Sequence, residues 1–75
     1  MIKELDEIVL TSDIPEYRLQ AGDLGTVVDV HPSGREYTVE FFTLEGKTVA
    51  IIPLAPDQIR PIASGEIASA RVLNR

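Results

Sequence analysis

The stretch Ala21-Gly22-Asp23-Leu24-Gly25-Thr26-Val27-Val28-Asp29-Val30 constrains the fold more than any other part of this chain. Two glycines three residues apart lead directly into a run of β-branched residues. Gly22 suits a tight turn that other side chains resist. Gly25 at the start of a strand indicates a bulge or a close approach of two backbones. Because a bent strand entered through a glycine turn lets a very small sheet curl onto itself, we expect a small β-barrel.

The length and the cysteine content narrow the class of protein. A chain of 75 residues allows one domain with a small core. The absence of cysteine favours the cytoplasm, because secreted domains of this size usually depend on disulfides. The N-terminus lacks the apolar run of a signal peptide, and the longest apolar run, residues 49–55, is too short to span a membrane.

The charge of the chain bears on its partners. The net charge is −5 and the isoelectric point is about 4.6. Nucleic-acid binding is therefore not expected, because such proteins need clustered lysine and arginine to replace phosphate counterions. An acidic surface keeps a small protein soluble, and it also suits a face that meets a basic protein partner.

Alternating apolar residues and turn residues predict an all-β chain. The expected strands cover residues 5–11, 24–31, 35–43, 47–53 and 59–62, with one helical turn at 56–58 before the last strand. Gly34 and Gly46 are expected to turn the two central hairpins. In the second strand we expect Val28 and Val30 on one face and Val27 on the other.

Residues 12–22 predict an ordered loop that folds over one end of the barrel and is held by Ile14, Tyr17 and Leu19. Five short strands, this long first loop and the late helical turn together describe a five-stranded SH3-like barrel over residues 1–62. An OB-type barrel is the alternative, although that fold usually needs more residues. Residues 63–75 form a tail that either frays or docks on the barrel or on a second subunit.

The residues that carry chemistry in other proteins have no suitable neighbours in this sequence. His31 is the single histidine and precedes Pro-Ser-Gly, which is typical of a solvated turn. Without cysteine or a second histidine we expect no metal site and no cofactor. The serines lack the context of a nucleophile, so we expect no enzyme activity. The acidic residues of the second and third strands predict a solvated face.

Exposed apolar side chains indicate a protein-interaction module instead. Phe42 should point outward from the third strand, and a barrel this small leaves Ile52 and Leu54 hard to cover. Tyr17 and Arg18 lie in the first loop, beside the groove that binds peptides in SH3 folds. These five residues are the candidate protein-binding surface, together with an exposed strand edge and the Asp13–Gln20 loop. The partner is a second copy, with a dimer expected, or another protein, for example a basic one that an antitoxin-like or immunity-like protein would mask.

Six short stretches follow one another along the chain: Glu4-Leu5-Asp6, Val9-Leu10-Thr11, Pro15-Glu16, Gly22-Asp23-Leu24-Gly25-Thr26-Val27-Val28, Tyr37-Thr38-Val39-Glu40-Phe41 and Ile59-Arg60-Pro61. In this order they resemble a bacterial family known as domain of unknown function 4926. The resemblance implies a short cytoplasmic protein with an SH3-like barrel and assigns no catalytic residue. Such sequences often have glycine where this chain has Arg18, which bears on the shape of the loop.

Two weaker similarities give alternative functions. The glycine turn before residue 26 is similar to that of the KOW module of ribosomal and transcription proteins. That module normally carries basic residues near the turn, where this chain has Asp23 and Asp29. Small SH3-like subunits of photosynthetic electron-transfer complexes are similar as well, which implies an accessory role in a larger redox complex.

Overall fold

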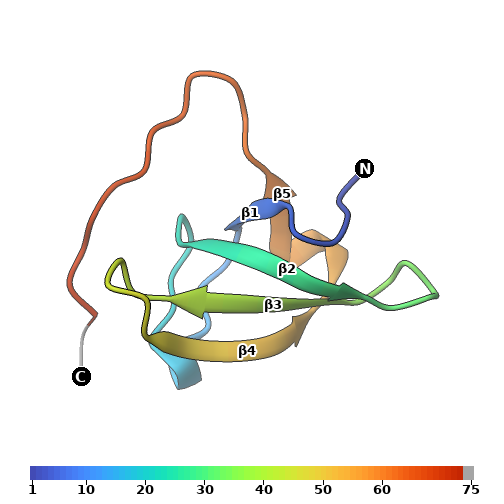
Figure 1. Ribbon diagram of the computed structural model, residues 1–75, viewed down its shortest axis with the longest axis horizontal. Helices are drawn as coiled ribbons and strands as arrows, with labels where there is room; N and C mark the ends of the chain where they lie inside the picture. Colours follow the sequence, from blue (N-terminus) through green and yellow to red (C-terminus); the bar gives the residue numbers. More distant parts are fainter. Residues whose placement is uncertain (74–75) are drawn as a thin grey trace.

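The computed structural model describes residues 1–73, in which five strands form one antiparallel sheet (Figure 1). The strands are β1 (Glu7–Leu10), β2 (Leu24–Val30), β3 (Tyr37–Phe42), β4 (Thr48–Leu54) and β5 (Ile59–Pro61). The helical elements in this part of the chain are two single 3-10 turns, η1 (Pro15–Tyr17) and η2 (Pro56–Gln58). The prediction of an all-β chain with five strands and a helical turn before the last one is confirmed.

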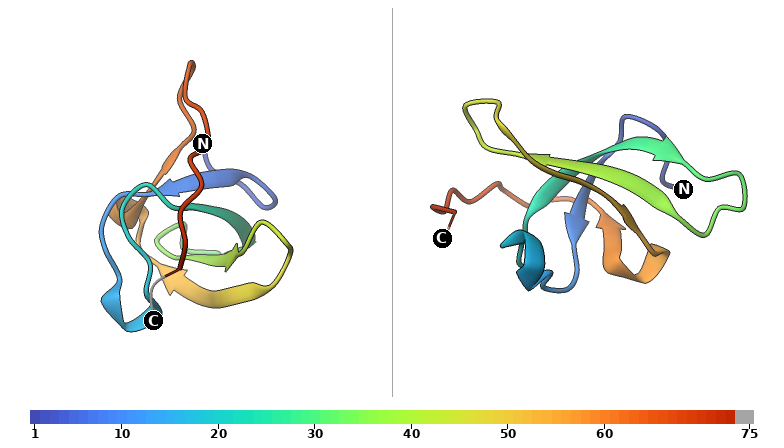
Figure 2. Two further views of the ribbon diagram at one scale, coloured as in Figure 1. Left: turned by 90° about the vertical axis from the view of Figure 1, so that its left-hand side faces the viewer. Right: turned by 90° about the horizontal axis from the view of Figure 1, so that it is seen from below.

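The strand order in the sheet is β4-β3-β2-β1-β5, so the first strand lies between the second and the last. Val9 of β1 pairs with Leu24 on one side and with Arg60 on the other. Both views in Figure 2 show the sheet curling around a common interior. In the described residues β4 and β5 form the two edges, and no ladder joins them. The result is a partly open barrel whose strand order fits the predicted SH3-like arrangement.

The core lies inside this curl and is entirely apolar in the described part of the chain. Its most deeply buried side chains are those of Ile8, Leu10, Val27, Val39 and Phe41. At Gly25 the side chains of two β3 residues pack directly against β2. A Cβ atom at this position would lie 2.6 Å from Cγ1 of Val39 and 2.9 Å from Cε1 of Phe41. All of these atoms belong to side chains and the register at Gly25 is regular, so glycine is needed here for side-chain packing, and the predicted bulge or close approach of two backbones is not found at this position.

A β-bulge in β2 changes which valines face the core. Val27 pairs with Val39 of β3 and Asp29 pairs with Thr38, so Val28 is the extra residue. Val27 is consequently buried, and Val30 also packs against the core although it lies three residues further on. The expectation that Val28 and Val30 share a face opposite Val27 was wrong, because one inserted residue shifts the alternation.

A second irregularity lies between β3 and β4, and here the structure contradicts the prediction that two residues of β4 lie at the surface. Phe41 pairs with Ala50 and Phe42 pairs with Thr48, which leaves Val49 unpaired in the register. Beyond this point the even-numbered side chains of β4 face inward, so Ile52 and Leu54 are buried in the core. Their prediction as exposed binding residues was wrong, and Ile51 points outward in their place.

The long first loop is ordered and is held by two of the three predicted side chains. Ile14 and Leu19 are buried in the core cluster, and the N–H of Ile14 donates to the carbonyl of Leu19 at 2.9 Å. Tyr17 is exposed instead. Arg18 ends η1 with φ 60° and ψ 29°, the left-handed conformation that glycine adopts most easily. The chain therefore keeps a glycine-type turn at Arg18, at a backbone cost of about 1 kcal/mol.

Residues 62–73 follow β5 without helix or strand. Figure 1 shows this tail arching away from the sheet and returning at the end of the barrel where the β3–β4 hairpin and the η1 loop lie. The arch begins with a turn in which the N–H of Glu66 donates to the carbonyl of Ala63 at 3.3 Å.

Candidate partner-binding surface

The turn from Gln20 to Asp23 positions a carboxylate at the start of β2. The N–H of Asp23 donates to the carbonyl of Gln20 at 3.0 Å, and the N–H of Gln20 donates back to Oδ2 of Asp23 at 2.9 Å. Gly22 supports this turn with φ +99° and donates its N–H to the carbonyl of Leu10. Hydrogen bonds within the loop and to β1 therefore fix the orientation of the Asp23 carboxylate.

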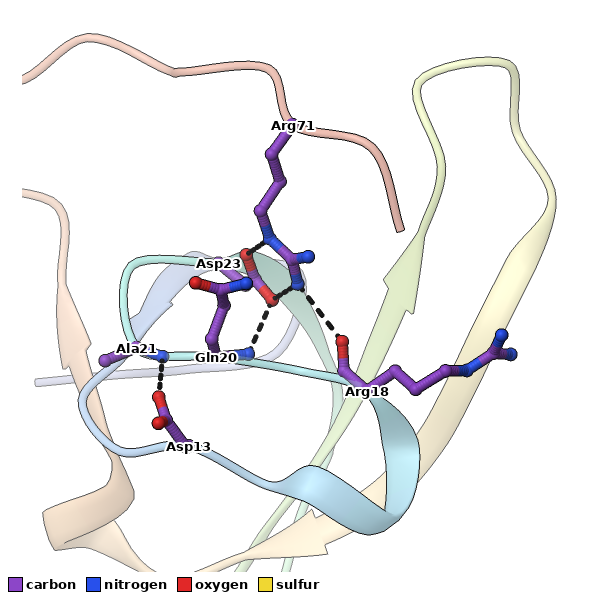
Figure 3. A network of polar contacts seen from close by, with 6 residues as sticks. All are labelled: Asp13, Arg18, Gln20, Ala21, Asp23 and Arg71. Carbon is purple, nitrogen blue, oxygen red and sulfur yellow. Dashed lines mark hydrogen bonds and ion pairs between the residues drawn. The ribbon is translucent and has the colours of Figure 1, made fainter. Parts of the chain in front are cut away.

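This carboxylate binds a guanidinium from the tail, as Figure 3 shows. Nε of Arg71 donates to Oδ1 of Asp23 at 2.9 Å, and Nη2 donates to Oδ2 at 2.5 Å. The same Nη2 donates to the carbonyl of Arg18 at 3.2 Å. The side chains of Asp23 and Arg71 are 18% and 28% exposed, so the pair is partly shielded from water. Two parallel hydrogen bonds of this kind are a strong and geometrically specific form of ion pair.

The local environment shifts the pKa of both partners. Partial burial acts to raise the pKa of Asp23, but the hydrogen bonds from Arg71 and from the Gln20 N–H hold this pKa below its usual value. Asp23 in turn raises the pKa of Arg71 through their hydrogen bonds. Both groups are therefore fully charged at neutral pH, and the pair persists there.

A hollow of about 260 Å³ lies beside this ion pair. Its lining comprises Asp13, Pro15, Arg18, Leu19, Gln20 and Arg71. The carboxylate of Asp13 also shapes the loop, because its Oδ1 accepts the N–H of Ala21 at 2.9 Å (Figure 3). The tail guanidinium forms part of the wall, and the rest of the hollow is open.

A smaller and more apolar hollow, of about 110 Å³, lies on the outer face of the sheet. Its walls include Leu24, Phe42 and Leu44, which are 39%, 48% and 91% exposed. Glu7, Gly25 and Thr26 complete the lining. We call this surface the Phe42 hollow. Three large apolar side chains exposed around one depression make this surface a candidate interaction site.

The structure places the five sequence-predicted site residues in four different surroundings. Arg18 contributes its carbonyl to the tail site, and Phe42 lines its own hollow. Tyr17 is exposed on η1, whereas Ile52 and Leu54 lie in the core. The sequence reasoning therefore placed one aromatic residue correctly on the outer face and assigned two core residues to the surface.

The residues of these surfaces that the sequence did not indicate include Asp23, Leu24, Leu44 and Arg71. Leu44 had a usable signal, because a leucine in the tight turn before Glu45-Gly46 cannot reach the core. No sequence signal connected Asp23 with Arg71, which are 48 residues apart. Their contact depends on the path of the tail.

The remaining polar residues of the described part of the chain form no metal-binding centre. His31 is exposed, and its Nδ1 accepts the N–H of Ser33 at 3.1 Å, as a turn residue does. Residues 1–73 contain no group of three or more side chains arranged to hold a metal ion. Within the same residues there is no helix long and apolar enough to cross a membrane.

Acidification is expected to loosen the turn at which the tail begins. Hydrogen bonds from Arg60 and from the Ala63 N–H lower the pKa of the Glu66 carboxyl from 4.5 to about 2. Since the pKa is depressed in the folded chain, the contribution of Glu66 to stability is complete above pH 4.5. It is lost as the pH falls from 4.5 to about 2. A carboxyl ¹³C NMR titration of Glu66 should give this low midpoint, and the Ala63 amide should shift with it.

The control for this titration is Arg60→Gln, in which Glu66 loses its guanidinium partner. We expect the midpoint of Glu66 to rise in this variant. A midpoint close to 4.5 in the unaltered chain would show that the turn at residues 63–66 is not held as described.

Comparison with known proteins gives one result. The family model described as "Domain of unknown function (DUF4926)" matches residues 4–61, which include all five strands. No curated protein and no solved structure matches the chain significantly. The match covers more than half of the chain and leaves the tail with Arg71 outside it. The chain therefore belongs to the DUF4926 family.

Proposed function

We propose that this chain is a non-enzymatic protein-interaction module that binds the apolar anchor of a basic partner protein in the Phe42 hollow. The observation that carries the proposal is the exposure of Leu24, Phe42 and Leu44 around one depression. Large apolar side chains gathered in this way lose contact with water only when another surface covers them.

The size of the hollow favours a protein side chain over a small molecule. Small-molecule sites usually have volumes of about 300–1,000 Å³. The Phe42 hollow, at about 110 Å³, has room for one apolar side chain of a partner. This supports a binding role in which an anchor residue is inserted and surrounding contacts exclude water.

The charge of the chain favours a basic partner. Glu7 lines the Phe42 hollow, Glu45 follows Leu44 directly, and the net charge is −5. A partner with lysine or arginine around its anchor is attracted by this negative charge, and the attraction speeds the encounter of the two proteins. A second copy would bring another charge of −5. Masking of a basic protein in the bacterial cytoplasm, as antitoxin-like or immunity-like proteins do, is one form of this function.

Replacing Phe42 with glutamate is expected to abolish partner binding while the fold stays intact. The substitution places a charge inside the apolar hollow, and loss of a central anchor contact usually weakens binding by at least about tenfold. The matched control is Ile67→Glu, which adds the same charge at an exposed apolar position of the tail. Capture from a lysate of the source cells, compared across the three chains by mass spectrometry, measures the effect.

The proposal predicts one stoichiometric protein that is retained by the unaltered chain and by Ile67→Glu and lost with Phe42→Glu. Retention should survive RNase and weaken as salt rises, because charge attraction contributes. Equal retention by Phe42→Glu would rule out the hollow as the binding site. Ribosomal proteins that disappear on RNase treatment would favour the KOW-like alternative. Sedimentation of the three chains tests the homodimer, which should dissociate with Phe42→Glu if a second copy fills the hollow.

A further inference from the structure

We propose that the loop of residues 12–23 is a recognition site for an arginine side chain of a partner protein, and that Arg71 of the tail occupies this site until a partner segment displaces it. The inference goes beyond the proposed function, because it concerns the loop and does not depend on the Phe42 hollow.

The first argument is that the acceptor groups are positioned without the tail. Asp23 receives the N–H of Gln20, and the turn is tied to β1 through the bond from Gly22 to the Leu10 carbonyl at 2.8 Å. The carbonyl of Arg18 is oriented by the left-handed end of η1. A site whose acceptors are already in place costs less ordering when a ligand binds.

The second argument is that the geometry selects arginine. The guanidinium of Arg71 donates through Nε and Nη2 to the two oxygens of Asp23 and through Nη2 to the Arg18 carbonyl. These three acceptors match one planar group with several fixed donors. An ammonium group is a single point of charge and cannot reproduce the paired contact.

The tail fills only part of the site. Val72, next to Arg71, is 86% exposed, and Ile67 is 90% exposed. Pro15, Leu19 and Gln20 border the hollow of about 260 Å³, and Val72 is not among the residues that line it. A partner segment that supplies an arginine and also fills this hollow makes every contact of the tail and adds apolar ones. Such a segment displaces the tail.

A peptide titration on the full chain tests this inference. The protein is ¹⁵N-labelled Arg71→Gln, in which the tail can no longer fill the site. The probe is a capped synthetic peptide with the sequence of residues 67–73, and NMR follows the amides of Gln20, Gly22 and Leu24. We expect saturable shifts of these amides. A tail that is docked about nine-tenths of the time would weaken the apparent affinity of the unaltered chain about tenfold.

Two comparisons make the result specific. Replacing the arginine of the peptide with citrulline, which has the same shape and no charge, should abolish the shifts on the same Arg71→Gln protein. Adding Asp23→Asn to Arg71→Gln should also abolish them. The citrulline comparison changes nothing in the protein, so it remains decisive even if Asp23→Asn disturbs the loop.

The inference is overturned if the arginine peptide produces no saturable shift in Arg71→Gln, or if the citrulline peptide binds equally well. It is also overturned if removal of Arg71 leaves the affinity unchanged. The Phe42→Glu variant separates this site from the proposed function, because peptide binding at the loop should survive that substitution. If the peptide gives no response while partner capture still depends on Phe42, the arginine site is contradicted and the proposed function is not.

Discussion

Gly25→Ala is expected to destabilise the fold by about 3 kcal/mol, because the added methyl group has no space. Its carbon would lie 2.6 Å from Cγ1 of Val39 and 2.9 Å from Cε1 of Phe41, and both of these side chains are fully buried. A chain of this length has a total free energy of unfolding of about 4–11 kcal/mol. The loss should lower Tm by roughly 10–20 °C, which thermal and urea unfolding would measure.

Gly46→Ala is the control for the effect of removing a glycine. Gly46 has φ +96°, and no atom lies within 4 Å of the position that an added Cβ would take, so only backbone strain of about 1 kcal/mol is expected. Val39→Ala in the Gly25→Ala background should recover part of the lost stability, because it removes the closest atom. Equal losses for Gly25→Ala and Gly46→Ala would show that the packing of β3 side chains against β2 is not what requires glycine.

The two neighbouring phenylalanines should respond in opposite ways to replacement by alanine. Phe41 is 2% exposed and packs in the core, so Phe41→Ala should cost about 3–5 kcal/mol, most of the stability of the chain. Phe42 is 48% exposed on the outer face, so Phe42→Ala should change the free energy of unfolding by less than about 0.5 kcal/mol. Urea unfolding of the two variants measures both values.

The two alanine substitutions also distinguish an effect on stability from an effect on partner binding. If the proposed function is correct, Phe42→Ala should weaken partner capture although it leaves the fold intact. A loss of stability at Phe42 similar to that at Phe41 would mean that the outer side chain is covered by the chain itself. The Phe42 hollow would then not be an open surface.

The sequence predicted those parts of the fold that depend on local rules. Gly22, Gly34 and Gly46 all adopt positive φ at the expected turns, and the helical turn at Pro56–Gln58 precedes the last strand as predicted. Each of these features is decided by a residue and its near neighbours.

The parts of the fold that could not be predicted depend on one inserted residue in each of two strands. The irregularities at Val28 and Val49 each shift the alternation of a strand by one position. Ile52 and Leu54 were assigned to the surface because a barrel this small was expected to leave them uncovered, although they complete the core. A bulge is set by the packing of two strands, so the alternation within one strand does not reveal it.

The edges of the sheet limit how another protein can attach. Pro53 lies in β4 and Pro61 lies in β5, and proline has no N–H to offer a neighbouring strand. An incoming strand would therefore find gaps in its hydrogen-bond ladder at either edge, which protects the chain from fibril-like stacking through its backbone. Strand addition is therefore disfavoured at these two prolines, and side chains and loop carbonyls offer the other contacts. Specificity for one partner over another can consequently evolve through single substitutions at the surface without any change to the sheet.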